Sequence, residues 1–121
     1  MSELKKKVLQ KKLARPVYAA LKNVVGEQWI YEQRSVVETY SKMSIEGASF
    51  LKKHEKDPHV LPACAVLPGT IDEVQAIVKI CNRYGVPFIP FTNGQVFCNP
   101  TNQEPTLIIH LSRMNRVLGI D

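Results

Sequence analysis

The feature that most constrains the fold is a strand, a helix and a second strand that follow one another between residues 65 and 90. A short apolar run at 65–67 leads through the turn Pro68-Gly69-Thr70 into a helix, and a second apolar run occupies 86–90. A connecting helix of this length lets two strands lie parallel in one sheet. The apolar run 106–111 adds a third strand. We therefore predict an α/β fold with a small, mainly parallel three-stranded sheet flanked by helices.

The helix between the first two strands is marked at both ends. Thr70 and Glu73 form a capping box at its start, and Gly85 is placed to end it. One face carries apolar residues at three- and four-residue spacing, namely Ile71, Val74, Ile77, Val78 and Cys81. We expect a helix over 71–84 that buries this face. The strand after it contains Pro87 and Pro90, which predicts a position at a sheet edge or a strand end.

The first quarter of the chain has helical periodicity with one interruption. Apolar residues recur at helical spacing from Leu4 to Val25, but Pro16 lies within the pattern. Because proline removes a backbone donor and disfavours helix at the residue before it, we predict a break at Arg15 and a helix over 16–25 that Gly26 closes.

The pattern is weaker from residue 27 to residue 61. Trp29 and Ile30 are consistent with a brief extended segment, and 36–40 with a short turn of helix. We divide the chain into a helical lead-in with a connector, residues 1–61, and a lobe of strand, helix, strand, loop and strand, residues 62–121.

Composition and charge narrow the class of protein. The chain has 121 residues, 45% hydrophobic and 22% charged, which is ordinary for one globular domain. The net charge of +5 is local, because six of the 16 basic residues lie in the first fifteen positions (Lys5, Lys6, Lys7, Lys11, Lys12 and Arg15). The basic residues are not interleaved with aromatic ones, so nucleic-acid binding is disfavoured.

Targeting and metal signals are missing from the sequence. It contains neither an apolar run long enough to span a bilayer nor a secretory signal, so we expect a cytoplasmic location and no transmembrane segment. The three cysteines, Cys64, Cys81 and Cys98, show no C-x-x-C spacing. Reduced thiols fit this pattern, and no metal site is predicted.

The ordered motifs of the second half resemble the start of the FAD-binding domain of the FAD-linked oxidases, the family of vanillyl-alcohol oxidase, glycolate oxidase flavin subunits and D-lactate dehydrogenases. The resemblance is carried by the P-G-T-I-D-E-V segment at 68–74, by G-V-P at 85–87 and by L-S-R-M-N at 111–115, and it extends over most of 21–121. It implies the first lobe of a two-lobed flavin-binding domain, with FAD as cofactor. It also implies an oxidoreductase that acts on a 2-hydroxy acid or similar small substrate.

In this family a glycine-rich loop after the second strand holds the FAD pyrophosphate, because glycines let backbone N–H groups approach an anion closely. The positions that match this loop are Phe91, Thr92, Asn93, Gly94, Gln95 and Val96. Gly94 keeps the family's glycine, whereas Phe91 stands for the usual arginine, and Thr92 and Asn93 stand for two of the usual glycines. The resemblance therefore implies a cofactor site at 91–96 that binds FAD weakly.

Other polar residues have structural interpretations that we favour over functional ones. His110 is a candidate base or ligand but lies in an apolar strand, and Cys81 is expected to pack in the core. Cys98 could attach flavin covalently, although its loop should meet the pyrophosphate. Arg113 and Arg116 could pair with phosphate or lie solvated at the strand end. No catalytic residue is identified.

The partner prediction follows from the family's longer architecture. Family members continue with a further FAD-contacting segment and a substrate domain, so this chain alone, a fragment or a subunit, is not expected to be catalytically competent. We expect the remaining flavin and substrate domains, or a partner subunit, to dock between Leu111 and Asp121, where apolar residues cluster. A homo-oligomer is the alternative. The competing function is a non-catalytic interaction or structural subunit derived from the same fold that no longer binds FAD.

Overall fold

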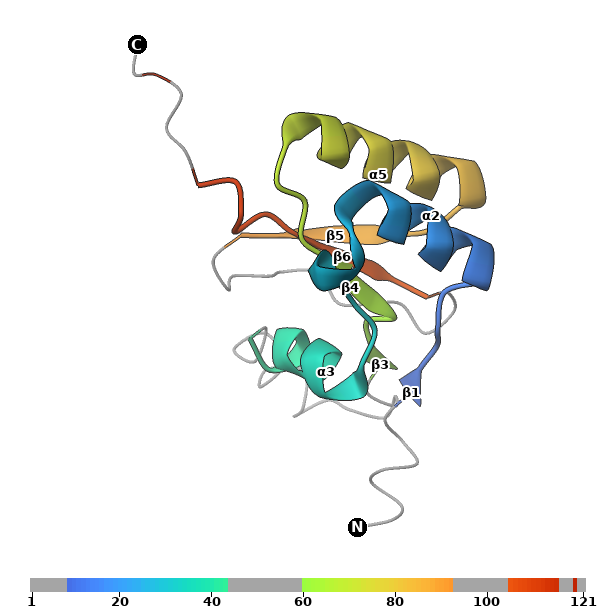
Figure 1. Ribbon diagram of the computed structural model, residues 1–121. Coiled ribbons are helices and arrows are strands. Elements are labelled where there is room, and N and C mark those ends of the chain that lie inside the picture. The colour runs from blue at the N-terminus through green and yellow to red at the C-terminus, as the bar shows by residue number, and fades with distance from the viewer. Residues whose placement is uncertain (1–8, 44–59, 93–104, 116–118, 120–121) are drawn as a thin grey trace.

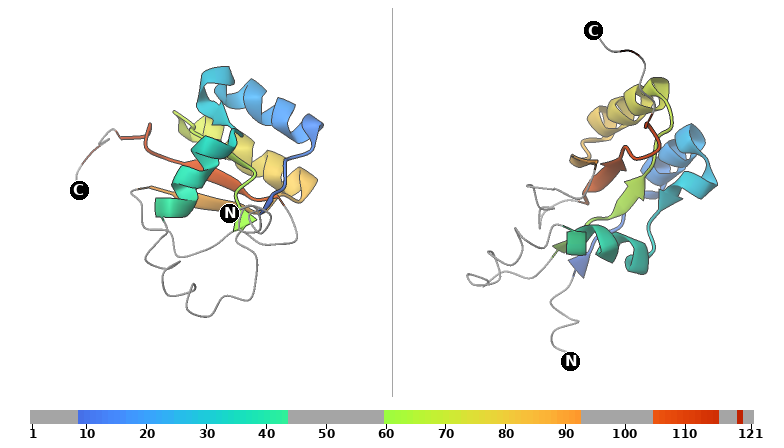
Figure 2. Two further views of the ribbon diagram at one scale, coloured as in Figure 1. Left: turned by 90° about the horizontal axis from the view of Figure 1, so that it is seen from below. Right: turned by 90° about the vertical axis from the view of Figure 1, so that its left-hand side faces the viewer.

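A computed structural model describes residues 9–43, 60–92, 105–115 and 119. Helices α2 (Arg15–Val25) and α5 (Ile71–Tyr84) lie side by side on one face of a sheet, and α3 (Arg34–Met43) lies on the opposite face (Figure 1). The views in Figure 2 show the same three layers. The predicted α/β architecture, a mainly parallel sheet flanked by helices, is confirmed.

The main sheet has four strands in the order β2-β4-β6-β5. Strands β4 (Cys64–Val66), β6 (Leu107–His110) and β5 (Phe88–Phe91) are parallel, as predicted, and β5 forms an edge. The prediction of three strands was wrong by one: β2 (Ile30–Tyr31) pairs antiparallel with β4. Of the brief extended segment expected at Trp29 and Ile30, only Ile30 belongs to this strand, because Trp29 ends a 3-10 helix. Two residues are too few to show the alternation that identifies a strand in a sequence.

Three predictions for the first half need correction. Leu9 and Gln10 belong not to a helix but to strand β1 (Leu9–Gln10), which pairs with β3 (Val60–Leu61) in a separate two-stranded sheet. The predicted short turn of helix at 36–40 is α3, a helix of ten residues. Helix α2 begins at Arg15, one residue earlier than expected, because a proline is tolerated in the first turn of a helix.

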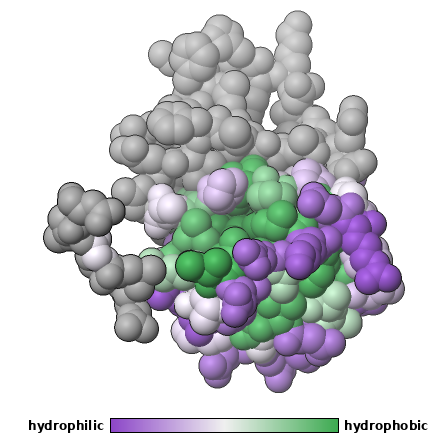
Figure 3. All heavy atoms as spheres, turned by 90° about the horizontal axis from the view of Figure 1, so that it is seen from above, coloured by the Kyte–Doolittle hydropathy of each residue, from purple (hydrophilic) through white to green (hydrophobic). Residues whose placement is uncertain are grey.

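The core lies on both faces of the main sheet because side chains alternate along each strand. One face of the sheet packs against α2 and α5. Its side chains are Cys64 and Val66 of β4 and Leu107 and Ile109 of β6, and they meet Leu21, Ile77 and Cys81 of the two helices. Seen from above α2 and α5, hydrophobic residues gather between hydrophilic ones (Figure 3). The opposite face packs Ala65, Ile89, Phe91 and Ile108 against Tyr40 of α3.

Helix α5 has the predicted ends. The Thr70 side chain accepts a hydrogen bond from the Glu73 backbone N–H at 3.1 Å, and Gly85 ends the helix with a left-handed φ of 68°. Ile77 and Cys81 are buried, as expected. Val74 and Val78 are half-buried, and Ile71 in the first turn is 59% exposed, so the face is buried less completely than predicted.

Candidate functional site

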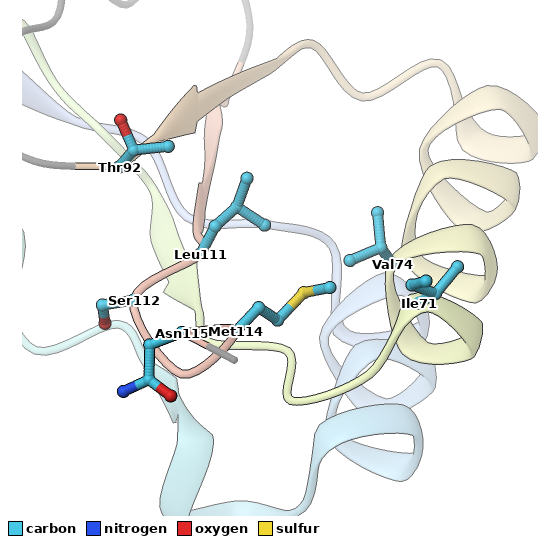
Figure 4. A pocket seen from close by; sticks show the side chains of 7 residues that line it. All are labelled: Ile71, Val74, Thr92, Leu111, Ser112, Met114 and Asn115. Atoms are coloured by element: carbon cyan, nitrogen blue, oxygen red, sulfur yellow. The ribbon is translucent and has the colours of Figure 1, made fainter. Parts of the chain in front are cut away.

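A pocket of about 520 Å³ lies at the carboxyl ends of the parallel strands (Figure 4). Three segments line it: the first turns of α5, the residue that follows β5 and the segment that follows β6. The lining residues are Ile71, Val74, Thr92, Leu111, Ser112, Met114 and Asn115. The carboxyl edge of a parallel sheet is where α/β proteins bind ligands, and the volume suits a small molecule or one part of a larger one.

Strand register brings the segments after β5 and β6 together. Phe91 pairs with His110, and the backbone N–H of Leu111 donates to the Phe91 carbonyl oxygen at 2.9 Å. The chain then turns, because the Met114 N–H donates to the Leu111 carbonyl oxygen at 3.0 Å. This turn directs the side chains of Leu111 and Met114 toward the first turns of α5 (Figure 4).

The lining defines what the pocket can do chemically. Ile71, Val74, Leu111 and Met114 supply an apolar wall, and Thr92, Ser112 and Asn115 supply hydroxyl and amide groups. These seven side chains carry no titratable group. The apolar wall can pack against an apolar or planar group, and the hydroxyl and amide groups can orient its polar edge through hydrogen bonds. The lining side chains cannot act as a general acid or base.

The predicted loop at 91–96 is described only at its first two residues. Phe91 is buried, and its ring faces α3 rather than the pocket. Thr92 is exposed and lines the pocket. Asn93, Gly94, Gln95 and Val96 lie outside the described residues. Their assignment to the cofactor stays a prediction.

On the α3 face, His110 makes a contact that the sequence did not indicate. The Tyr40 hydroxyl lies 2.8 Å from Nδ1 of His110, and both rings meet Phe91 edge to face, with centroid distances of 5.2 and 4.9 Å. Burial raises the pKa of Tyr40 to about 12 and lowers the pKa of His110. Tyr40 and His110 are 70 residues apart, so no local pattern could have revealed the pair.

The lowered pKa of His110 predicts how stability depends on pH. Because the unfolded chain binds this proton more tightly than the folded one, lowering the pH below the ordinary value of 6.5 should reduce the free energy of unfolding. The loss should level off once the pH is below the pKa of the folded state. Urea unfolding at several pH values measures it. His110→Gln should reduce this slope, and an unchanged slope would contradict the prediction.

The remaining candidates have structural roles or lie outside the described part. Arg113 is half-buried and bonded to the Leu67 carbonyl oxygen, so neither the phosphate-pairing nor the solvated interpretation describes its contacts. Burial raises the pKa of Cys64 to about 12 and that of Cys81 to about 11, which makes both thiols unreactive. Cys98 and Arg116 fall outside the described ranges. Within those ranges, no three His, Cys, Asp or Glu side chains could hold a metal ion together.

Comparison with known proteins gives a consistent result. A family model described as an FAD binding domain matches residues 62–121. D-lactate dehydrogenase (cytochrome) 1, mitochondrial, of Saccharomyces cerevisiae is 28% identical over 105 residues, which cover 84% of this chain and 17% of that protein. Glycolate oxidase subunit GlcD of Bacillus subtilis is 32% identical over 62 residues, which cover 50% of this chain and 13% of the subunit.

Solved structures share the fold. The chain superposes on alkyldihydroxyacetonephosphate synthase with a TM-score of 0.70 at 21% identity, covering 93% of this chain and 22% of that one. The TM-score for 4-ethylphenol oxidase from Gulosibacter chungangensis is 0.67 at 24% identity, with the same coverage. The chain thus spans about a fifth or less of the length of these relatives. Every helix in the described ranges is too short or too polar to cross a membrane.

Proposed function

Because this chain belongs to the FAD-linked oxidases and carries the first part of their FAD-binding domain, we propose that the pocket at the carboxyl ends of β5 and β6 holds part of the cofactor. The observation that carries this proposal is the position of the pocket, at the ligand-binding edge of a parallel sheet. Its apolar wall and its three hydrogen-bonding side chains suit part of a large, planar cofactor. When bound, the flavin supplies the redox chemistry, and this lobe binds and orients it.

We propose that the FAD pyrophosphate is bound by the loop that consists of Phe91, Thr92, Asn93, Gly94, Gln95 and Val96. Thr92 supports the assignment because it joins the end of β5 to the pocket. The Phe91 side chain cannot take part, since it is buried on the other face of the sheet. Backbone N–H groups and the Thr92 side chain are then the groups that would meet the anion.

For the whole protein we infer a flavin-dependent oxidoreductase that acts on a 2-hydroxy acid or similar small substrate. The names of the D-lactate dehydrogenase and glycolate oxidase relatives support this class. The remaining flavin and substrate domains, or a partner subunit, would dock beyond Leu111, where Met114 already lies at the pocket. A cytoplasmic location stays a prediction from the sequence, since the name of the yeast relative states a mitochondrial one.

A titration with FAD tests the proposal. The 121-residue chain is expected to bind FAD with a dissociation constant on the order of 100 μM, because one glycine remains in the loop. Thr92→Glu should weaken binding about tenfold, since it places a negative charge where the pyrophosphate would lie. Isothermal titration calorimetry measures both constants.

The matched control is Ala19→Glu, which adds the same charge on an exposed position of α2 that does not line the pocket. It should leave the dissociation constant unchanged. A folded parent chain without measurable FAD binding at millimolar concentration would favour the non-catalytic subunit instead. Equal weakening by both glutamates would place the cofactor elsewhere.

A further inference from the structure

The guanidinium of Arg113 is held by three parts of the fold at once. Its Nη1 donates to the carbonyl oxygen of Leu67 at 2.7 Å, and its central carbon lies 4.0 Å from the centroid of the Trp29 ring. The Glu73 carboxylate is 3.9 Å away. These contacts join the segment after β6 to the end of β4, to the first turn of α5 and to the short helix η1 (Glu27–Trp29). A planar guanidinium can stack and donate at the same time, which a lysine ammonium cannot do.

Gly69 provides the space that this guanidinium occupies. A Cβ at Gly69 would lie 2.7 Å from Nη2 and 2.8 Å from the central guanidinium carbon of Arg113. A Cβ atom does not come so close to atoms with which it shares no bond, so a side chain at this position requires the guanidinium to shift from the place it occupies. The Gly69 N–H also donates to the Glu73 carboxylate at 3.3 Å, which fixes the turn before α5 from its other side.

The two segments that Arg113 joins carry the two walls of the pocket. Gly69 lies just before α5, whose Ile71 and Val74 form one wall. Arg113 lies between Ser112 and Met114, which belong to the other (Figure 4). The Arg113 guanidinium, which lies against Gly69, therefore connects the two walls of the pocket.

We propose that Arg113 is a positioning residue that clamps the segment after β6 onto the start of α5 and thereby holds the pocket in its binding shape. The identity of the ligand rests on the proposed function. The clamp, meaning the contacts of Arg113 with Leu67, Trp29 and Glu73, does not depend on it. Its contribution comes from the packed, planar guanidinium rather than from its charge.

Gly69→Ala tests the clamp without removing any contact group. The new methyl group should push the guanidinium away, so this variant should reproduce the effects of Arg113→Ala and add nothing to them in the double variant. Two readouts need no ligand. Trp29 is the only tryptophan of the chain, so its emission reports the stacked guanidinium directly. Amide exchange of Met114 should become about tenfold faster or more when the turn after β6 is released.

Arg83→Ala is the matched control. Arg83 lies 5.8 Å from the ring of Tyr84 at the other end of α5, away from the pocket. Its removal should change neither the Trp29 emission nor the Met114 exchange. Circular dichroism confirms that each variant is folded, and Gly69→Ala keeps the test decisive should Arg113→Ala fail to fold.

Titration with FAD then separates positioning from charge. Gly69→Ala, Arg113→Ala and Arg113→Lys should each weaken binding about tenfold, because a loosened pocket must be reordered on binding. Retention of parental affinity by Arg113→Lys would overturn the proposal in favour of a charge contact. Additive effects of Gly69→Ala and Arg113→Ala on emission and exchange would also overturn it. A parent that binds no FAD would sink the proposed function alone, since emission and exchange still decide the clamp.

Discussion

Replacing Ile77 with alanine is expected to lower the free energy of unfolding by about 2–5 kcal/mol. Ile77 is 0% exposed and belongs to the core between the sheet and helices α2 and α5. The truncated side chain would lose its transfer free energy, and the close packing around it would leave a cavity that cannot collapse fully. Because domains of this size are stable by about 5–15 kcal/mol, the variant should be close to the limit of folding.

Ile71→Ala is the matched control for this prediction. It removes the same atoms from the same helix, but Ile71 is 59% exposed. Its cost should stay within about 0.5 kcal/mol, as for most surface substitutions. Urea unfolding monitored by circular dichroism compares the two. If Ile71→Ala proved to be the more destabilising variant, the buried face of α5 would be assigned wrongly.

Phe91→Ala is expected to cost about 3–5 kcal/mol on the other face of the sheet. Its ring is 3% exposed and packs edge to face against both Tyr40 and His110. Edge-to-face pairs add to the effect of burial, so the loss should loosen α3 from the sheet. The hydrogen bond between Tyr40 and His110 would lose the ring that supports it.

The same strand supplies the control. Phe88 also lies on β5 but on the opposite face, where it is 38% exposed. Phe88→Ala should cost less than about 1 kcal/mol. The comparison therefore removes the same ring from the same strand and changes only the face. Equal costs for the two alanines would show that α3 does not pack on the sheet as described.

Local signals explain which elements could be predicted from the sequence. Helix α5 is marked by a capping box, a left-handed glycine and an apolar stripe, and all three lie between Thr70 and Gly85. The three parallel strands are short apolar runs between turn residues. Strands β1, β2 and β3 have two residues each, which is a single period of the strand alternation and too short to recognise as a pattern. They are stabilised by pairing with distant segments.

The candidate site was predictable only in part for the same reason. The resemblance pointed to the loop that starts at Phe91, and the structure places Thr92 beside a pocket. The rest of that pocket depends on tertiary contacts. Arg113 reaches Leu67 across 46 residues, and Tyr40 reaches His110 across 70. Ile71 was expected to be buried, because periodicity identifies an apolar face but not where its cover ends.

The position of Pro90 in the edge strand β5 bears on how this sheet resists aggregation. The carbonyl groups of Pro87 and Phe91 point to β6, so the backbone of Phe88 and Pro90 faces outward from the sheet. Pro90 has no N–H, which leaves an incoming strand a single donor within β5, at Phe88. A proline on an edge strand makes that edge a poorer template for the stacking of copies. The outward carbonyl groups of Phe88 and Pro90 remain as acceptors, so a strand that pairs along β5 would meet a hydrogen-bond ladder interrupted at Pro90.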